Sequence, residues 1–198
     1  MRANFTTLIL GLFFLTLTPD LSAQEPGDFD YVYTSLSQAI ENPDWVYHLD
    51  LSKKRLNDFP KEIKNFEHLI TLDLSRNKIS QLPIFIGELS KLEELYLSKN
   101  KFSFLPPQIK NLKNLKILDI SKNKVRQLAD EIGELEALIE LNASNNDLEK
   151  IPPTIEKLTQ LQLLNLRSNL IQQDVEQKLK KWLPKTNIHF TSYCECRF

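Results

Sequence analysis

Apolar residues recur along this chain at a fixed interval. Equivalent positions follow one another every 23 residues without an insertion, at Val46, Leu69, Leu92, Leu115, Leu138 and Leu161. Within one such unit, Leu95 and Leu97 alternate with polar neighbours, which is the two-residue period of a short strand buried on one face. Ile109 and Leu112 then follow two prolines at helical spacing, which predicts a short helical or 3₁₀ segment. Each unit therefore predicts one strand and one return segment.

Repeated strands of this kind are expected to form one parallel sheet, because each strand is followed by a crossover and then by an equivalent strand. A single unit buries too little apolar surface to offset the conformational entropy of ordering its backbone. Packing and hydrogen bonds between units must supply the rest. The sequence therefore predicts a stack of coils whose stability is cooperative along the array.

The spelling of the unit is L-x-x-L-x-L-x-x-N-x-L-x-x-L-P-x-x-I-x-x-L, and residues 46–174 resemble six leucine-rich repeats. The resemblance implies an α/β fold: a right-handed leucine-rich-repeat solenoid with a parallel concave sheet and short helical or 3₁₀ convex segments. Secreted animal members of this family usually close their ends with cysteine-rich caps. This chain lacks such caps, so it is more similar to the bacterial exported members.

Asparagine occupies one position of the unit, where the predicted strand ends. Its amide can satisfy backbone groups of adjacent turns that strand pairing leaves without partners, and the family resemblance implies such an asparagine ladder. The predicted ladder residues are Asn77, Asn100, Asn123, Asn146 and Asn169. The first unit has Lys54 at this position, so it is expected to be a terminal repeat.

The segments before the repeats are expected to be a leader and a cap. Residues 1–23 combine a basic start, a short apolar run and a small-residue exit. This arrangement predicts a secretory signal peptide that is cleaved near Ala23, and an exported protein that is either secreted or periplasmic. Residues 24–45 are expected to form an N-terminal cap, in which Ser35 and Gln38 are interpreted as the capping box of a short helix.

Residues 175–198 are expected to form a C-terminal cap. Val175, Leu179 and Trp182 share one face of a predicted helix that ends before a proline, and residues 188–190 predict a last edge strand. Cys194 and Cys196 follow. Their spacing is compatible with a bridge within the tail, an intermolecular bridge, free thiols or half of a metal site. Because the chain has no other cysteine, its core must hold the fold.

Charge and composition argue against several classes of function. The chain carries 25 Lys+Arg against 26 Asp+Glu, and no run of like charges marks a nucleic-acid arm or a polybasic membrane patch. The apolar run of the leader is too short for a transmembrane anchor. The chain also lacks a glycine-rich phosphate loop and any histidine at ligand spacing from a cysteine or carboxylate. The sequence therefore predicts no enzyme, no cofactor and no metal.

The outward strand positions are expected to bind a protein or an extended peptide on the concave face. Tyr96, Ile117 and Leu163 add apolar bulk to a polar surface, and Arg167 interrupts a column of serines. Aromatic and arginine side chains ringed by polar groups are common at interaction hot spots. The predicted binding residues are Glu94, Tyr96, Ile117, Asp119, Glu140, Asn142, Leu163 and Arg167.

Other interpretations of this face stay open at the level of sequence. The serines and most aspartates match the ordinary spelling of the repeat and are expected to be scaffold. The alternative function is a cell-envelope or extracellular structural protein that recognises polysaccharide. Asp50 with Asp73 suits calcium, and Asp73 with Glu94 suits glycoside hydrolysis, but an open sheet seldom has the depth that either needs.

A basic row accompanies the acidic one, in the turn after the strands. It consists of Lys53, Arg76, Lys99 and Lys122. We expect these cations to balance the solvated acidic row of the neighbouring strand positions. The identity of the partner and the oligomeric state are not indicated by the sequence.

Overall fold

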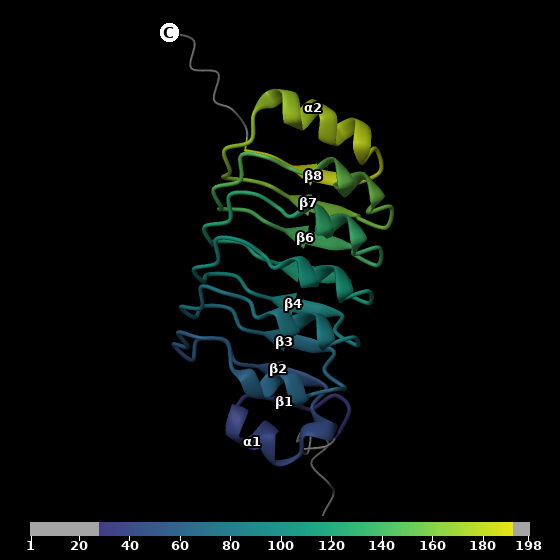
Figure 1. The fold of residues 1–198 in the computed structure, drawn as a ribbon. Coiled ribbons are helices and arrows are strands. Elements are labelled where there is room, and N and C mark those ends of the chain that lie inside the picture. Colours follow the sequence, from purple (N-terminus) through teal and green to yellow (C-terminus); the bar gives the residue numbers. More distant parts are fainter. Residues whose placement is uncertain (1–27, 192–198) are drawn as a thin grey trace, which may run out of the picture.

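The computed structural model describes residues 28–191 as one stack of coils (Figure 1). A single sheet of eight parallel strands runs through the stack in chain order. The strands are β1 (Val32–Tyr33), β2 (His48–Asp50), β3 (Thr71–Asp73), β4 (Glu94–Tyr96), β5 (Ile117–Asp119), β6 (Glu140–Asn142), β7 (Leu163–Asn165) and β8 (Asn187–His189). The predicted class of fold, a leucine-rich-repeat solenoid with a parallel sheet, is confirmed.

Short 3₁₀ helices return the chain from the end of one strand to the start of the next. They are η1 (Pro43–Trp45), η2 (Lys61–Asn65), η3 (Ile84–Glu88), η4 (Pro107–Asn111), η5 (Asp130–Glu134) and η6 (Pro153–Lys157). The residue before each of the last five is extended, with φ close to the value that proline imposes, and it is a proline in all of them except η5, where it is Ala129. These segments are too short for a stable α-helix, which explains the 3₁₀ form.

The core is one continuous column because the strands pair in the register of the repeat. Leu72 pairs with Leu95, and Leu95 pairs with Leu118. In strands β2 to β7 the central residue is buried and its two neighbours are half-buried. Each leucine therefore packs against the equivalent leucine of the next coil, and the alternate side chains form the opposite face of the sheet.

The asparagine column joins each coil to the one before it. In Asn100, the side-chain oxygen accepts a hydrogen bond from the Ile79 amide at 3.0 Å, and Nδ2 donates to the carbonyl oxygens of Leu74 at 2.8 Å and Leu97 at 3.1 Å. The same pattern recurs at the other predicted positions, Asn77, Asn123, Asn146 and Asn169. These amides fix the turns that follow the strands.

Helices close both ends of the stack (Figure 1). At the C-terminal end, α2 (Gln173–Trp182) buries Leu179, and Val175 and Trp182 pack against the core as the apolar stripe predicts. At the N-terminal end, α1 (Leu36–Glu41) follows β1, a strand that the sequence did not indicate. Apolar side chains of α1 and α2 therefore cover the first and the last coil.

The predicted capping box at α1 is wrong. The Ser35 side chain makes no capping hydrogen bond, and its Oγ lies 2.8 Å from the Ser37 Oγ instead. The Gln38 Nε2 donates to the Tyr31 hydroxyl at 3.2 Å, so it does not reach back to the helix start. The hydrogen bond to the Tyr31 hydroxyl has replaced the expected bond to the start of the helix.

Two predictions concern parts of the chain outside the described residues: the signal peptide of residues 1–23, and the roles of Cys194 and Cys196. Between residues 28 and 191, no helix combines the length and the apolar character that crossing a bilayer requires.

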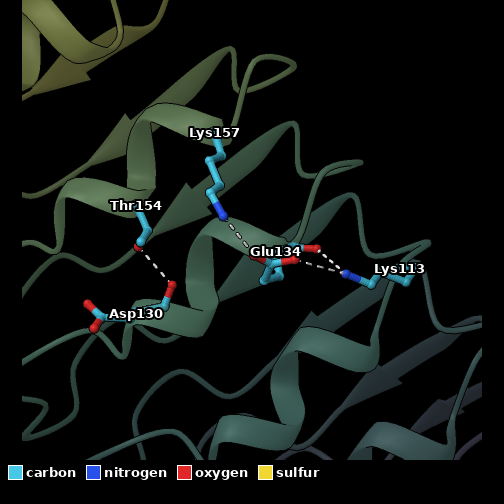
Figure 2. A network of polar contacts seen from close by, with 5 residues as sticks. All are labelled: Lys113, Asp130, Glu134, Thr154 and Lys157. Carbon is cyan, nitrogen blue, oxygen red and sulfur yellow. Dashed lines mark hydrogen bonds and ion pairs between the residues drawn. The ribbon is translucent and has the colours of Figure 1, made fainter.

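Polar contacts also join neighbouring return segments, as Figure 2 shows. Glu134 on η5 lies between two lysines of adjacent coils, with its carboxylate 2.9 Å from the Lys157 Nζ and 3.6 Å from the Lys113 Nζ. The hydrogen bond from Lys157 is the main cause that holds the pKa of Glu134 below its ordinary value. The Thr154 hydroxyl donates to the Asp130 carbonyl at 2.7 Å. Because these ion pairs are exposed, each contributes little to stability.

Candidate binding surface

The concave face consists of two columns of side chains that point away from the core. The Cα register places the first residue of each strand beside its equivalents and the third residue beside its own. The first column is His48, Thr71, Glu94, Ile117, Glu140 and Leu163, and the second is Asp50, Asp73, Tyr96, Asp119, Asn142 and Asn165. These side chains are half-buried, so the sheet presents a regular surface without a deep cleft.

Tyr96 is the aromatic centre of this face, and it is held by Glu94. The Tyr96 hydroxyl donates to the Glu94 Oε2 at 3.0 Å. Burial is the largest cause that raises the pKa of the Tyr96 phenol far above its ordinary value of 10.0, followed by the Glu94 hydrogen bond and the charges of Glu140 and Asp73. The ring is therefore neutral, oriented and surrounded by carboxylates.

Ile117 lies between two of these carboxylates. Ile117 is on β5, and its Cα pairs with Glu94 on β4 and with Glu140 on β6. Tyr96 pairs with Asp119 on the same strand as Ile117, so Tyr96 and Ile117 are diagonal neighbours on one face, a position in which large side chains reach each other. Leu163 pairs with Glu140 and extends the column to β7. Apolar and acidic groups thus alternate across β4 to β7.

Two of the predicted binding residues serve the adjacent turns. The Asp119 Oδ1 accepts a hydrogen bond from the Ser121 amide at 2.8 Å, and the Asn142 Oδ1 accepts from the Ser144 amide at 3.3 Å and the Ser144 hydroxyl at 2.8 Å. This agrees with the expectation that most of the Asp and Ser positions are scaffold. Six of the predicted residues lie together on β4 to β6, whereas Arg167 is exposed two residues beyond the end of β7.

The carboxylates proposed for calcium or hydrolysis are engaged in the same way. Asp50 and Asp73 each accept the amide of the serine two residues later at 2.7 Å, and Glu94 accepts the Tyr96 hydroxyl. Among residues 28–191, no group of three or more His, Cys, Asp or Glu side chains has the arrangement of a metal site. The concave face therefore offers contact surface and oriented polar groups.

The structure also brings together residues that the sequence reading did not connect. A second basic column, which starts at Arg55 and continues through Lys78, lies beside the row that contains Lys53 and Arg76. Phe104 and Ile84 are exposed and line a groove that also includes Ile79, the residue after Lys78. The 23-residue register could have identified the second basic column, because equivalent positions of successive repeats become neighbours in space.

The geometry defines a leucine-rich-repeat solenoid, and the sequence comparisons agree. One family model, described as a leucine rich repeat, matches residues 46–102, and a second, described as a leucine-rich repeat region, matches residues 86–183. The chain belongs to the leucine-rich-repeat family, as the spelling of the unit predicts. Proteins with this fold are generally interaction modules and are typically non-catalytic scaffolds. No curated protein matches the chain.

Solved structures of the same fold come from bacteria and plants. A leucine-rich-repeat protein of Leptospira interrogans is 38% identical, with a TM-score of 0.70 over 77% of this chain and 39% of that one. Internalin C2 of Listeria monocytogenes is 25% identical, with a TM-score of 0.68 over 80% and 66%. A plant peptide hormone receptor in complex with RGF2 is 30% identical, with a TM-score of 0.57 over 68% and 22%. This chain therefore spans less than two thirds of each relative.

Proposed function

We propose that this protein is a non-catalytic module that binds a protein or an extended peptide on its concave face, centred on Tyr96 and Ile117. The observation that carries the proposal is the oriented Tyr96 ring, which is hydrogen-bonded to Glu94 and diagonal to Ile117 on an otherwise polar sheet. A ring that is already ordered loses little conformational entropy on binding. An aromatic anchor with a polar rim is the composition that most often carries binding energy.

The dimensions of the face suit such a ligand. Strands β2 to β7 stack at about 4.8 Å each, so the face spans roughly 24 Å. This length accommodates an extended peptide or the edge of a domain. The relative described as a plant peptide hormone receptor in complex with RGF2 supports a peptide as the class of ligand. Because the two chains share only part of their length, the likeness supports the class of ligand and neither the partner nor the place where it binds.

Export is part of the proposal. The spelling of residues 1–23 supports a cleaved leader, which would leave the binding face outside the cytoplasm. Mass spectrometry of the protein recovered from the culture supernatant or periplasm tests this step. A mature N-terminus at Gln24 is the expected result, whereas recovery of the intact chain from the cytoplasm would contradict it.

The test of the binding face is a capture experiment with two double variants. The purified protein is used as bait against extracellular and surface extracts of its host, and captured proteins are compared between Tyr96→Ala/Ile117→Ala and the unaltered chain. Loss of about 2 kcal/mol at a hot spot corresponds to roughly thirtyfold weaker binding. We therefore expect the partner to be lost from the double variant.

The matched control is Thr71→Ala/Asn187→Ala, which changes two side chains of the same outward column on β3 and β8. This control should bind like the unaltered chain. Equal capture by all three proteins would place the binding surface elsewhere. If glycan arrays give hits that depend on Tyr96 while protein capture gives none, polysaccharide recognition replaces the proposal.

A further inference from the structure

Two columns of cations form a basic edge along the turns that follow β2 to β5. The first column is Lys53, Arg76, Lys99 and Lys122, and the second is Arg55, Lys78, Lys101 and Lys124. In Figure 1 the turns after the strands line up along one side of the stack. Residues that are 23 positions apart in the sequence therefore become neighbours in space, and scattered single cations become one charged surface.

Backbone hydrogen bonds fix the spacing of this edge. In the first column, the Arg76 amide donates to the Ser98 carbonyl of the next coil at 2.8 Å, and the Lys99 amide donates to the Ser121 carbonyl at 2.9 Å. In the second column, the Lys101 amide donates to Ile79 of the preceding coil at 2.8 Å. Each coil advances by about 4.8 Å, so four coils give a basic edge roughly 14 Å long.

The charge of the edge is not neutralised within the described part of the chain. None of the ion pairs among residues 28–191 involves these eight cations, although we expected the first column to balance the acidic strand positions. Those aspartates instead accept amides of their own turns. The guanidinium of Arg76 and then the ammonium of Lys122 hold the pKa of Lys99 below its ordinary value, because neighbouring like charges disfavour the charged form of Lys99.

The edge has a defined end. In the fifth coil, Asn145 and Asp147 stand where Lys122 and Lys124 stand in the fourth. Asn145 keeps the left-handed backbone conformation of the column, with φ of 55° against 56° at Lys122. The conformation of this turn therefore does not require a lysine, and asparagine is the residue that tolerates it best after glycine. The four consecutive cations are a property of the surface and not of the turn.

An open groove with mixed apolar and polar lining includes Ile79, the residue that follows Lys78 of the second column. Its volume is about 390 Å³, and its apolar lining includes Phe59, Ile84 and Phe104. Its polar lining consists of Asn57, Asp58, Ser80 and Gln81, so the one carboxylate in the groove is that of Asp58. Ile84 is 71% exposed and Phe104 is 51% exposed. The equivalent of Phe104 is a glutamine in the coils before and after it, Gln81 and Gln127, so the repeat does not demand an aromatic residue there.

We propose that the basic edge and this groove together bind an acidic, extended segment of a partner protein, with carboxylates along the cation columns and one large apolar side chain beside Phe104. Charge complementarity selects an anionic partner. The small groove, with polar groups among its apolar ones, suits a peptide side chain and backbone better than the flat surface of a membrane. The edge is separate from the concave site, so either can fail without the other.

The probe for this proposal is a short fluorescent peptide of glutamates around one central phenylalanine, with two partner peptides. One replaces every glutamate with glutamine, and the other replaces the phenylalanine with alanine. Fluorescence anisotropy with the full chain should show binding of the first peptide that weakens as salt is added. The glutamine peptide should bind at least tenfold more weakly. No binding of the acidic peptide at low salt would overturn the proposal.

The charge variant is Arg76→Asn/Lys99→Asn/Lys122→Asn. It gives three more coils the asparagine that the fifth coil has at Asn145. Three exposed charge pairs of about 0.5 kcal/mol each predict roughly tenfold weaker binding of the acidic peptide. Circular dichroism should show an unchanged fold. Binding equal to that of the unaltered chain would contradict the role of the edge.

The control for net charge removes three exposed lysines that lie off the edge, Lys64, Lys110 and Lys185, by substitution with asparagine. This control should retain the affinity of the unaltered chain for the acidic peptide. An equal loss in the control and in the edge variant would show that only net charge matters, and would overturn the assignment of a site.

The groove is tested with Phe104→Gln, which copies the neighbouring coils. It should weaken binding of the phenylalanine peptide several-fold and leave the alanine peptide unaffected. An equal effect on both peptides would remove the groove from the proposal. Vesicles of phosphatidylglycerol provide the last arm: if they bind the protein through the edge while the acidic peptide does not, the partner is a membrane surface and the proposal is wrong.

Discussion

Gly133 lies directly beside the carbonyl of Thr154 in the next coil. A Cβ atom added at Gly133 would be 2.3 Å from that oxygen and 2.8 Å from its carbon. Real Cβ atoms do not approach backbone atoms so closely, so the two 3₁₀ helices η5 and η6 pack at a distance that only glycine permits. The close approach is a packing requirement, because neither partner is a flexible side chain end.

Gly133→Ala is therefore expected to destabilise the protein, although alanine restricts the unfolded chain more than glycine does. Overpacking of this kind costs about 1–3 kcal/mol. In a protein of this size, 1 kcal/mol lowers Tm by about 2–4 °C, which thermal unfolding followed by circular dichroism resolves. Asp130→Ala on the same 3₁₀ helix should leave Tm nearly unchanged, since its side chain is exposed.

Gly87 provides an internal ranking for the same effect. A Cβ atom there would lie 2.7 Å from the Gln108 carbonyl oxygen, a milder overlap than at Gly133. Gly87→Ala should therefore lower Tm by less than Gly133→Ala. The reverse order, or no change in either variant, would show that the coils separate easily and that the packing is less tight than described.

Asn123 makes hydrogen bonds to four backbone groups, one of which is the Ser121 carbonyl at 3.2 Å from Nδ2. Its side-chain oxygen accepts the Phe102 amide at 3.0 Å, and its Nδ2 donates to the carbonyls of Leu97 at 3.0 Å and Ile120 at 2.9 Å. Leucine is similar in size but satisfies none of these groups. Each buried backbone group left without a hydrogen-bond partner costs about 1–3 kcal/mol. Asn123→Leu should therefore lower the free energy of unfolding by several kcal/mol, measured by denaturant unfolding.

The control for the ladder is Asn114→Leu. Asn114 is exposed and makes one side-chain hydrogen bond, from its Nδ2 to the Ser90 carbonyl at 2.8 Å. Water can satisfy that carbonyl when the amide is removed, so this variant should unfold at nearly the same denaturant concentration as the unaltered chain. If both variants lose stability equally, the column of asparagines is not a special support of the turns.

The fold could be predicted from the sequence because one register controls every level of it. The spacing of Leu72, Leu95 and Leu118 places each buried side chain, each strand partner and each turn amide in the same relation to the next coil. Local and tertiary preferences agree within these repeats. A pattern repeated in this way averages out the ambiguity that a single short apolar run would carry.

The ends and the surfaces were less predictable. Ser35 and Gln38 match a capping box by spacing, yet Gln38 contacts Tyr31, because a tertiary partner outweighs a local hydrogen bond. The sequence indicated the first basic column but not the second, because Lys78 and Lys101 are isolated in the sequence and become neighbours only when the coils stack. On the concave face, the sequence indicates Tyr96 as unusual but does not show that Glu94 holds its hydroxyl.

The Tyr96 hydroxyl should not ionise in the pH range of an ordinary tyrosine. Burial, the Glu94 hydrogen bond and the charges of Glu140 and Asp73 raise the pKa of Tyr96 above its ordinary value of 10.0. Between about pH 9 and pH 11, where ordinary tyrosines ionise, the folded protein should therefore gain no tyrosinate absorbance from Tyr96. Tyr96→Phe should leave the absorbance titration of the folded protein unchanged in that range.

The same shift affects stability with a definite sign. Below about pH 9 the phenol is protonated in both folded and unfolded chains, and its contribution is constant. As pH rises further, the unfolded chain loses the proton first, so the folded state is progressively disfavoured. The unaltered protein should therefore lose stability more steeply above pH 10 than Tyr96→Phe does. Glu94→Gln should lower the pKa of Tyr96 and flatten this slope; identical slopes in all three proteins would show that the hydroxyl is not held as described.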